Sequence, residues 1–209
     1  MPLIRSRPDK PDVDHPPVDL RAALLSGSPE ERWTAARTVT ELRVRGDALL
    51  LAQALELEKD CRVREAIFTG LARIATSESV LAVLPYLRSD DANLRTGALD
   101  ALRMMPDATR PHLEALLGDP DADVRLLTCD LTRSQPGPVA TRMLTALLEA
   151  EPEANVCAAA VEVLAEVGSP LAVPSLLRCA DRFRSDPFLG FAIKHVIVRL
   201  GSPSSAGGD

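Results

Sequence analysis

The side chains that could do chemistry are arginines that recur along the chain at a nearly constant spacing. Arg32, Arg64, Arg95 and Arg125 follow one another at steps of 32, 31 and 30 residues. A column of guanidinium groups could bind an anion through paired N–H donors. The column could equally serve the fold, because each arginine has the same place in a recurring segment. We favour this structural interpretation.

No other group of residues has the spacing of a catalytic or metal centre. The three histidines lie far apart, and none of the four cysteines forms a CxxC pair. The sequence contains neither a glycine-rich phosphate loop nor a GxSxG turn. We therefore expect no metal and no cofactor, and we favour a non-catalytic role. The cysteines, which we expect to be mostly buried free thiols, are Cys61, Cys129, Cys157 and Cys179.

Composition narrows the class of protein. The net charge is −6 and the pI is about 5.2, which argues against a nucleic-acid binder with a basic footprint. Hydrophobic residues make up 46% of the chain but aromatic residues only 3%, a balance that suits packed helices. No apolar run is long enough to span a membrane, and residues 1–19 lack a secretion signal. We expect a cytoplasmic protein.

The arginines belong to a repeated segment of about 30 residues. The strongest copy is "DCRVREAIFTGL", starting at Asp60, and it recurs as "NLRTGALDAL" and "DVRLLTCDL". We number each copy from the residue before the arginine, its anchor. The predicted anchors are Glu31, Val63, Leu94, Val124, Val156 and Phe188. Apolar or small residues mostly follow four and eight positions later, which places them on one stripe of a helix.

A period of this length predicts a stack of helical hairpins. Each unit reads as a helix A, a short turn, and a helix B that starts at an Asp or Pro. Ser28 and Glu31 form a predicted capping box, and Pro85 is expected to kink or end its helix. We assign residues 1–18 to a disordered, proline-rich tail, 19–201 to the solenoid, and 202–209 to a disordered tail.

The recurring pattern D-x-x-V-R-x-x-A-x-x-A-L resembles the HEAT-repeat family, and most closely its short bacterial form named for phycobilisome lyases. The resemblance implies an all-α, right-handed α-solenoid of about six HEAT-like hairpins. It also implies that the arginines form a structural ladder with the caps of adjacent repeats. The partners that this implies are Asp60, Asp91 and Asp121.

The family serves many tasks, so the resemblance leaves the function open. We favour a scaffold or adaptor that binds another protein on the concave helix-B surface. One alternative is a bilin-lyase-like chaperone or lyase subunit. Another, which we rank last, is a HEAT-like DNA glycosylase, because the chain lacks the aromatic residues and positive charge such an enzyme needs.

In such stacks the B helices line the concave side, where side chains two and six residues after the anchor face outward. Six residues after the anchors stand Arg37, Thr69, Asp100, Asp130, Glu162 and Lys194. This row is acidic in the middle, which suits a partner protein with a basic segment. Glu65 and Trp33 lie two residues after their anchors. Trp33 could anchor the interface or only seal the first repeat.

The last helix, "PFLGFAIKHVIVRL", is unusually apolar. It could be the terminal cap of the stack or a partner surface. A cap needs a polar outer side, so an exposed Phe191 or Ile197 would favour the partner surface.

Overall fold

The computed structural model describes residues 18–42 and 46–201, and within these ranges the ordered elements are all helical. The predicted tails fall outside the described residues, apart from Val18, which begins the first helix. The all-α helical-repeat fold class is confirmed. The chain divides between Ala82 and Val83 into two compact units, which we call unit 1 and unit 2.

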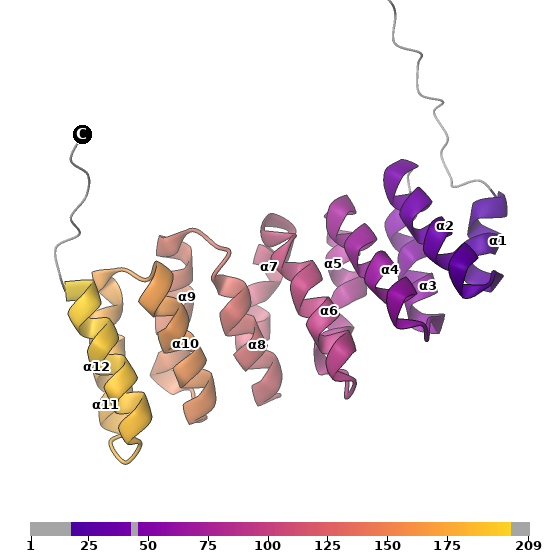
Figure 1. Cartoon of the computed structure of the whole chain (residues 1–209). Helices are drawn as coiled ribbons and strands as arrows, with labels where there is room; N and C mark the ends of the chain where they lie inside the picture. The colour runs from indigo at the N-terminus through magenta and orange to yellow at the C-terminus, as the bar shows by residue number, and fades with distance from the viewer. Residues whose placement is uncertain (1–17, 43–45, 202–209) are drawn as a thin grey trace, which may run out of the picture. The chain divides into compact units, whose positions relative to one another are not determined.

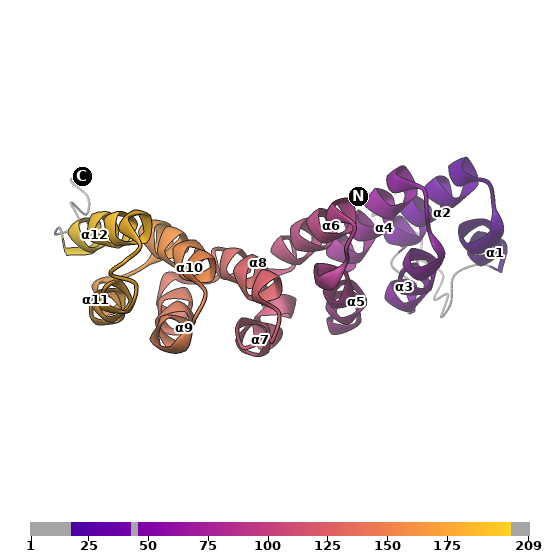
Figure 2. The ribbon, with the colours of Figure 1, turned by 90° about the horizontal axis from the view of Figure 1, so that it is seen from below.

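Unit 1 contains two layers of helices. In Figure 2, α2 and α4 form one layer, and α1 and α3 form the other. Helix α2 packs on α1 and α4, and α3 packs on α4. The helices of this unit are α1 (Val18–Ser26), α2 (Pro29–Leu42), α3 (Asp47–Leu57), α4 (Cys61–Ile74) and α5 (Ser77–Val83), which crosses the boundary by one residue.

Unit 2 repeats this arrangement. Helices α6, α8, α10 and α12 lie side by side in one layer, with α7, α9 and α11 in the other (Figures 1 and 2). We call these layers the B layer and the A layer, and α2 and α4 are the B layer of unit 1. The elements of unit 2 are η1 (Leu84–Arg88), α6 (Ala92–Arg103), α7 (Pro106–Leu117), α8 (Ala122–Thr132), α9 (Gly137–Ala150), α10 (Ala154–Val167), η2 (Pro170–Ala172), α11 (Val173–Arg182) and α12 (Pro187–Gly201).

The helix starts follow from their caps. Asp60 accepts hydrogen bonds from the backbone N–H groups of Arg62 and Val63, at 2.9 and 3.2 Å. Asp91 and Asp121 each accept one such bond at 2.9 Å from the residue two positions later. These bonds satisfy N–H groups that have no partner within the first turn of a helix.

Two further sequence signals shape the helix ends. At the start of α2, Ser28 and Glu31 exchange hydrogen bonds, which confirms the predicted capping box. The hydrogen bond that the Ser28 N–H donates to the Glu31 carboxylate holds the pKa of Glu31 below its usual value. Pro85 also acts as expected, because α5 ends at Val83 and the chain continues as a 3-10 turn.

The core lies between the two layers and is built from the anchor stripe of the B helices. Val63, Ile67 and Leu71 of α4 are almost completely buried, as are Val156, Ala160 and Leu164 of α10. Small residues four positions after an anchor, such as Ala98 and Ala160, leave no exposed surface, so the neighbouring helices approach closely.

The predicted anchor of the last repeat is wrong by one residue. Phe188 is 86% exposed, whereas Leu189 is 3% exposed and takes the core position. Ile193, four residues later, is also buried. The last repeat therefore follows Val156 at a step of 33 residues rather than 32. Asp186 caps this helix by accepting from the N–H groups of Phe188 and Leu189, both at 3.0 Å.

Candidate functional site

The exposed side of the B layer in unit 1 contains a hollow around Trp33. The hollow has a volume of about 410 Å³ and lies between α2 and α4. The guanidinium of Arg37 lies 4.7 Å from the centre of the Trp33 ring, and that of Arg62 lies 5.9 Å away. Trp33 is therefore a half-buried aromatic residue held by cations, rather than a bare aromatic anchor.

Charges of both signs surround this hollow. Arg73 lines it with Arg37 and Arg62, and so do Glu41 and Glu65. Arg62 also forms an exposed ion pair with Glu30 at 3.3 Å. Thr69 is exposed at the rim, as the sequence predicted for its position. The unit 1 surface is consequently mixed in charge.

The exposed side of the B layer in unit 2 has a different character. Carboxylates and guanidinium groups alternate across α6, α8 and α10. The Nε atom of Arg103 lies 2.6 Å from the Oδ2 atom of Asp130. Arg103 also binds Asp100 at 2.7 Å, and Arg133 lies 3.4 Å from Asp130. We call this group, extended below to α10, the acidic line.

Arg133 carries the acidic line onto α10. It contacts Glu162 at 3.4 Å and also pairs with Glu166. The complete line contains four carboxylates and two guanidinium groups, and so has a net charge of −2. Its members are Asp100, Asp130, Glu162, Glu166, Arg103 and Arg133.

This arrangement changes the expectation of a row of free acids. Asp100, Asp130 and Glu162 do share one face, but each is ion-paired with an arginine that the sequence reasoning missed. Both arginines stand three residues after an aspartate of the same row, and i, i+3 pairs lie next to each other on a helix. That repeated Asp-x-x-Arg spacing was the signal that could have revealed them.

The corrected register of α12 also moves one predicted site residue. Lys194 now stands five residues after its anchor, the place that Val161 and Cys129 occupy as buried residues in their repeats. Lys194 is exposed at that place. His195, rather than Lys194, now lies in the row of Asp130 and Glu162. Phe191 takes the position two residues after the anchor and is 75% exposed.

The arginine column makes contacts within the fold. Arg64, Arg95 and Arg125 each donate to the backbone carbonyl six residues earlier, at 2.6–2.9 Å. Arg32 donates to Gly27 O at 2.7 Å. These bonds tie the start of each B helix to the turn before it.

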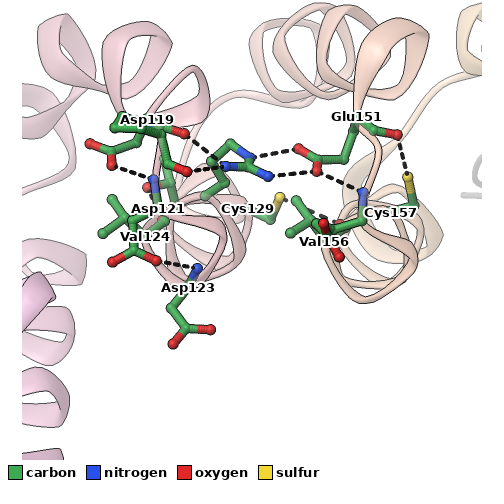
Figure 3. A network of polar contacts seen from close by, with 12 residues as sticks. Asp119, Asp121, Asp123, Val124, Cys129, Glu151, Val156 and Cys157 are labelled. Atoms are coloured by element: carbon green, nitrogen blue, oxygen red, sulfur yellow. Dashed lines mark hydrogen bonds and ion pairs between the residues drawn. The ribbon is translucent and has the colours of Figure 1, made fainter. Parts of the chain in front are cut away.

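Two of the arginines also reach the next repeat. Arg32 binds both carboxylate oxygens of Glu58 at 2.7 and 2.9 Å, and Arg125 binds those of Glu151 at 2.7 and 2.8 Å. Figure 3 shows Glu151 on one side of this network and Asp119 on the other. Glu58 and Glu151 each stand two residues before the N-cap residue of the B helix that follows them. The partner of these two arginines is therefore a glutamate in the turn and not the predicted cap aspartate.

Burial and pairing act in opposite directions on these glutamates. Burial would raise the pKa of Glu58 and of Glu151, whose side chains are each 2% exposed. The hydrogen bonds from Arg32 and Arg125, with backbone N–H donors, outweigh it and hold both pKa values below the usual value. Both glutamates are therefore charged at neutral pH and belong to the fold.

One of the two repeats that lack the arginine receives a guanidinium group from another helix. Cys157 stands at the arginine position of α10 and is fully buried. Arg182 of α11 reaches the end of α9 and the turn after it, and donates to the carbonyls of Leu148, Glu149 and Glu151 at 2.7–3.1 Å. A guanidinium group thus binds this turn from the A layer instead of the B layer.

Three of the four cysteines are packed in the core. Cys129, Cys157 and Cys179 are buried free thiols, and Cys61 is exposed. Burial raises the pKa of Cys129 to about 12, so this thiol is protonated at neutral pH.

Across residues 18–42 and 46–201, no three His, Cys, Asp or Glu side chains come together as metal ligands. In the part of the chain that the structure describes, no helix combines the length and the apolar character needed to cross a bilayer.

Comparison with known proteins identifies the repeat. Residues 47–130 match the family model described as HEAT repeats. An archaeal HEAT-like repeats protein from Thermococcus onnurineus has a similar structure, with 16% sequence identity and a TM-score of 0.50. The match covers 87% of this chain and 85% of that one. The resemblance to HEAT repeats is confirmed.

Two further solved structures resemble the chain with lower scores. A phycocyanin lyase complex from Nostoc matches with 16% identity and a TM-score of 0.40, covering 95% of this chain and 100% of that one. A designed armadillo repeat protein matches with 14% identity and a TM-score of 0.44, covering 88% and 98%. Curated protein sequences give no match. Similarity at this level of identity concerns the fold.

Proposed function

We propose that this chain, whose residues 47–130 match the HEAT-repeat family, is a non-catalytic protein-binding module. A partner protein with a basic segment binds the exposed side of the B layer in unit 2. The observation that carries the proposal is the acidic line, which crosses three helices with a net charge of −2. Such a surface attracts cations and disfavours the phosphates of nucleic acid.

The exposure of the line supports this role. The side chains of Asp100 and Glu162 are 58% and 73% exposed, so a partner can reach them without moving the fold. Asp130 is 25% exposed and lies between two arginines, which fixes its position. A preorganised row of charges binds with a smaller entropic cost than mobile side chains do. We place the protein in the cytoplasm, in keeping with its free thiols.

The test compares two double charge reversals of equal size. The site variant is Asp100→Arg/Glu162→Arg. The control is Glu114→Arg/Asp181→Arg, whose side chains are 64% and 79% exposed on α7 and α11 of the A layer. Both variants change the net charge by the same amount, and thermal melts verify that both fold.

Each protein is used to retain partners from an extract of its host, and the retained protein is then purified and titrated. We expect wild type and control to bind it equally and the site variant to bind at least tenfold more weakly. Equal binding by the site variant would place the interface elsewhere. Equal loss in both variants would show only a general charge effect.

A further inference from the structure

The last B helix presents two phenylalanines that the fold does not use. Phe188 and Phe191 are 86% and 75% exposed, while Leu189 and Ile193 fill the core positions of α12. The equivalent places in α10 hold Asn155 and Ala158, which are small or polar. Two exposed aromatic rings three residues apart form an apolar patch on this helix, which indicates a binding surface.

These rings continue a row of apolar residues across the B layer. Leu126 of α8 and Ala158 of α10 stand two residues after their anchors, as Phe191 does after Leu189. Leu126 is half-buried and Ala158 is exposed. We call Leu126, Ala158, Phe188 and Phe191 the apolar strip.

The apolar strip runs beside the acidic line. Asp130 follows Leu126 by four residues, and Glu162 follows Ala158 by four. Residues four apart lie one above the other on the same face of a helix, about 6 Å apart. An apolar row and an acidic row therefore lie next to each other on α8 and α10. No described helix of unit 2 covers either row, because both lie on the exposed side of its B layer.

We propose that the strip and the line together bind an amphipathic, basic α-helix of the partner. This inference rests on the proposed function and specifies the shape of the segment bound. An α-helix presents an apolar stripe and a charged stripe side by side, which matches two adjacent rows. An extended strand presents one row of alternate side chains to a surface, so it matches only one of them.

The spacing of the B helices sets the spacing of the partner's cations. Packed helices lie about 8–10 Å apart, and an α-helix advances about 1.5 Å per residue. A helix lying across the B layer passes from one acid to the next in about five to seven residues, and of these spacings only seven keeps successive side chains on nearly the same side of the helix. Lysines or arginines at heptad spacing therefore face Asp100, Asp130 and Glu162 in turn, and apolar residues three or four positions away contact the strip.

The probe is a synthetic, fluorophore-labelled helical peptide of about three heptads with lysine at every seventh position and leucines on the adjoining stripe. Two control peptides have the same length. One carries glutamate in place of lysine, and the other has the same composition with lysines every five residues. Fluorescence anisotropy measures the binding of each peptide to the full chain. We expect the heptad peptide to bind at least tenfold more tightly than either control.

The protein variants test the phenylalanines. Phe188→Ala/Phe191→Ala removes the end of the strip. The matched control is Leu171→Ala/Leu177→Ala, which removes apolar side chains that are 81% and 55% exposed in the A layer of the same repeat. We expect at least a tenfold loss of peptide affinity for the first variant and less than a twofold change for the control. Circular dichroism verifies that both fold.

Several results would overturn this inference. If wild type binds the three peptides with equal affinity, the surface does not select a basic amphipathic helix. If the phenylalanine variant binds normally while Asp100→Arg/Glu162→Arg abolishes binding, the apolar anchoring is wrong and the proposed function stands. If sedimentation shows a wild-type dimer that the phenylalanine variant dissociates, the strip binds a second copy of this chain.

Discussion

Units 1 and 2 share one repeat but present different chemistry on their exposed B layers. In unit 1 the half-buried Trp33 lies against two arginines, and glutamates line the same hollow. In unit 2 the same rows hold carboxylates paired with Arg103 and Arg133, beside exposed phenylalanines. The inward positions are mostly apolar or small in both units, and α8 also buries Thr128 and Thr132. The comparison teaches that packing fixes one side of a B helix and leaves the other free to acquire a function.

The two units agree, by contrast, in how they join neighbouring repeats. Arg32–Glu58 in unit 1 and Arg125–Glu151 in unit 2 are both bidentate pairs with a glutamate that is 2% exposed. The arginine is 22% exposed in the first pair and 11% in the second. The two pairs therefore show how the burial of the arginine changes the stability that each pair contributes.

The largest expected effect comes from breaking these pairs. Glu151→Ala leaves Arg125 buried without its partner, and we expect the free energy of unfolding of unit 2 to fall by about 3 kcal/mol. Glu58→Ala should cost about 2 kcal/mol in unit 1, because water reaches Arg32 more easily. Urea unfolding measures both, with circular dichroism reporting the whole chain and the single tryptophan, Trp33, reporting unit 1.

Because Trp33 reports only on unit 1, its signal distinguishes the unfolding of the two units. Glu151→Ala should shift the transition seen by circular dichroism and leave the tryptophan transition in place. A tryptophan transition that moves equally would show that the two units unfold as one.

A second effect follows from the lowered pKa values of Glu58 and Glu151. Each pKa lies below the usual value of 4.5 in the folded state, so each pair stabilises the fold at pH values above 4.5. The contribution is lost as the pH falls through the lower, folded-state pKa. We expect the difference in unfolding free energy between wild type and Glu151→Gln to be largest at neutral pH and to shrink below about pH 4. A difference that is constant between pH 7 and pH 3 would contradict this account.

A smaller effect is expected at Gly70, where unit 1 is tightly packed. A Cβ atom at this position would lie 2.4 Å from the Thr40 Oγ1 atom and 3.0 Å from a methyl carbon of Leu51. Gly70→Ala should lower the free energy of unfolding of unit 1 by about 1–2 kcal/mol, because overpacking outweighs the better helix propensity of alanine. The tryptophan transition in urea measures it.

Thr40→Ala in the same chain provides the control for this cause. The double variant Thr40→Ala/Gly70→Ala should be more stable than the sum of the two single changes predicts. Strict additivity would mean that Gly70 is needed for a reason other than contact with Thr40.

The smallest effect on stability is expected at the acidic line. Arg103→Ala breaks ion pairs whose side chains are between 25% and 58% exposed and within reach of water, so the free energy of unfolding should change by less than about 0.5 kcal/mol. Removing a cation makes the line more negative, and affinity for the heptad lysine peptide should rise about two- to fivefold at low salt. Unchanged or weaker binding in the anisotropy assay would mean that Arg103 itself contacts the peptide.

The sequence predicted those parts of the fold that depend on local or repeated patterns. The caps at Asp60, Asp91 and Asp121 could be predicted because an N-cap involves only neighbouring residues. The buried stripe through Val63 and Ile67 could be predicted because its spacing is that of one helix face.

The remaining features depend on how helices that are distant in the sequence pack together, which residue spacing does not reveal. The anchor Leu189 was missed because one extra residue before α12 shifts the repeat, and adjacent Phe188 is equally apolar. The pairing of Arg103 with Asp130 joins residues 27 positions apart, a distance that only the packing of α6 and α8 makes short. The sequence thus indicated that Asp100, Asp130 and Glu162 share a face, but not that they are paired with arginines or that Lys194 lies outside their row.

The contacts of Arg182 limit where the repeat array can be truncated. Arg182 donates to two carbonyls at the end of α9 and to one in the turn that follows, so the α9–α10 hairpin is closed in part by a residue of the next hairpin. The hairpins that carry Arg95 and Arg125 hold their own turns through those arginines. Shortening the chain before α11 would therefore remove a closing contact from the α9–α10 hairpin, and shortening it before Glu151 would leave Arg125 without its carboxylate partner.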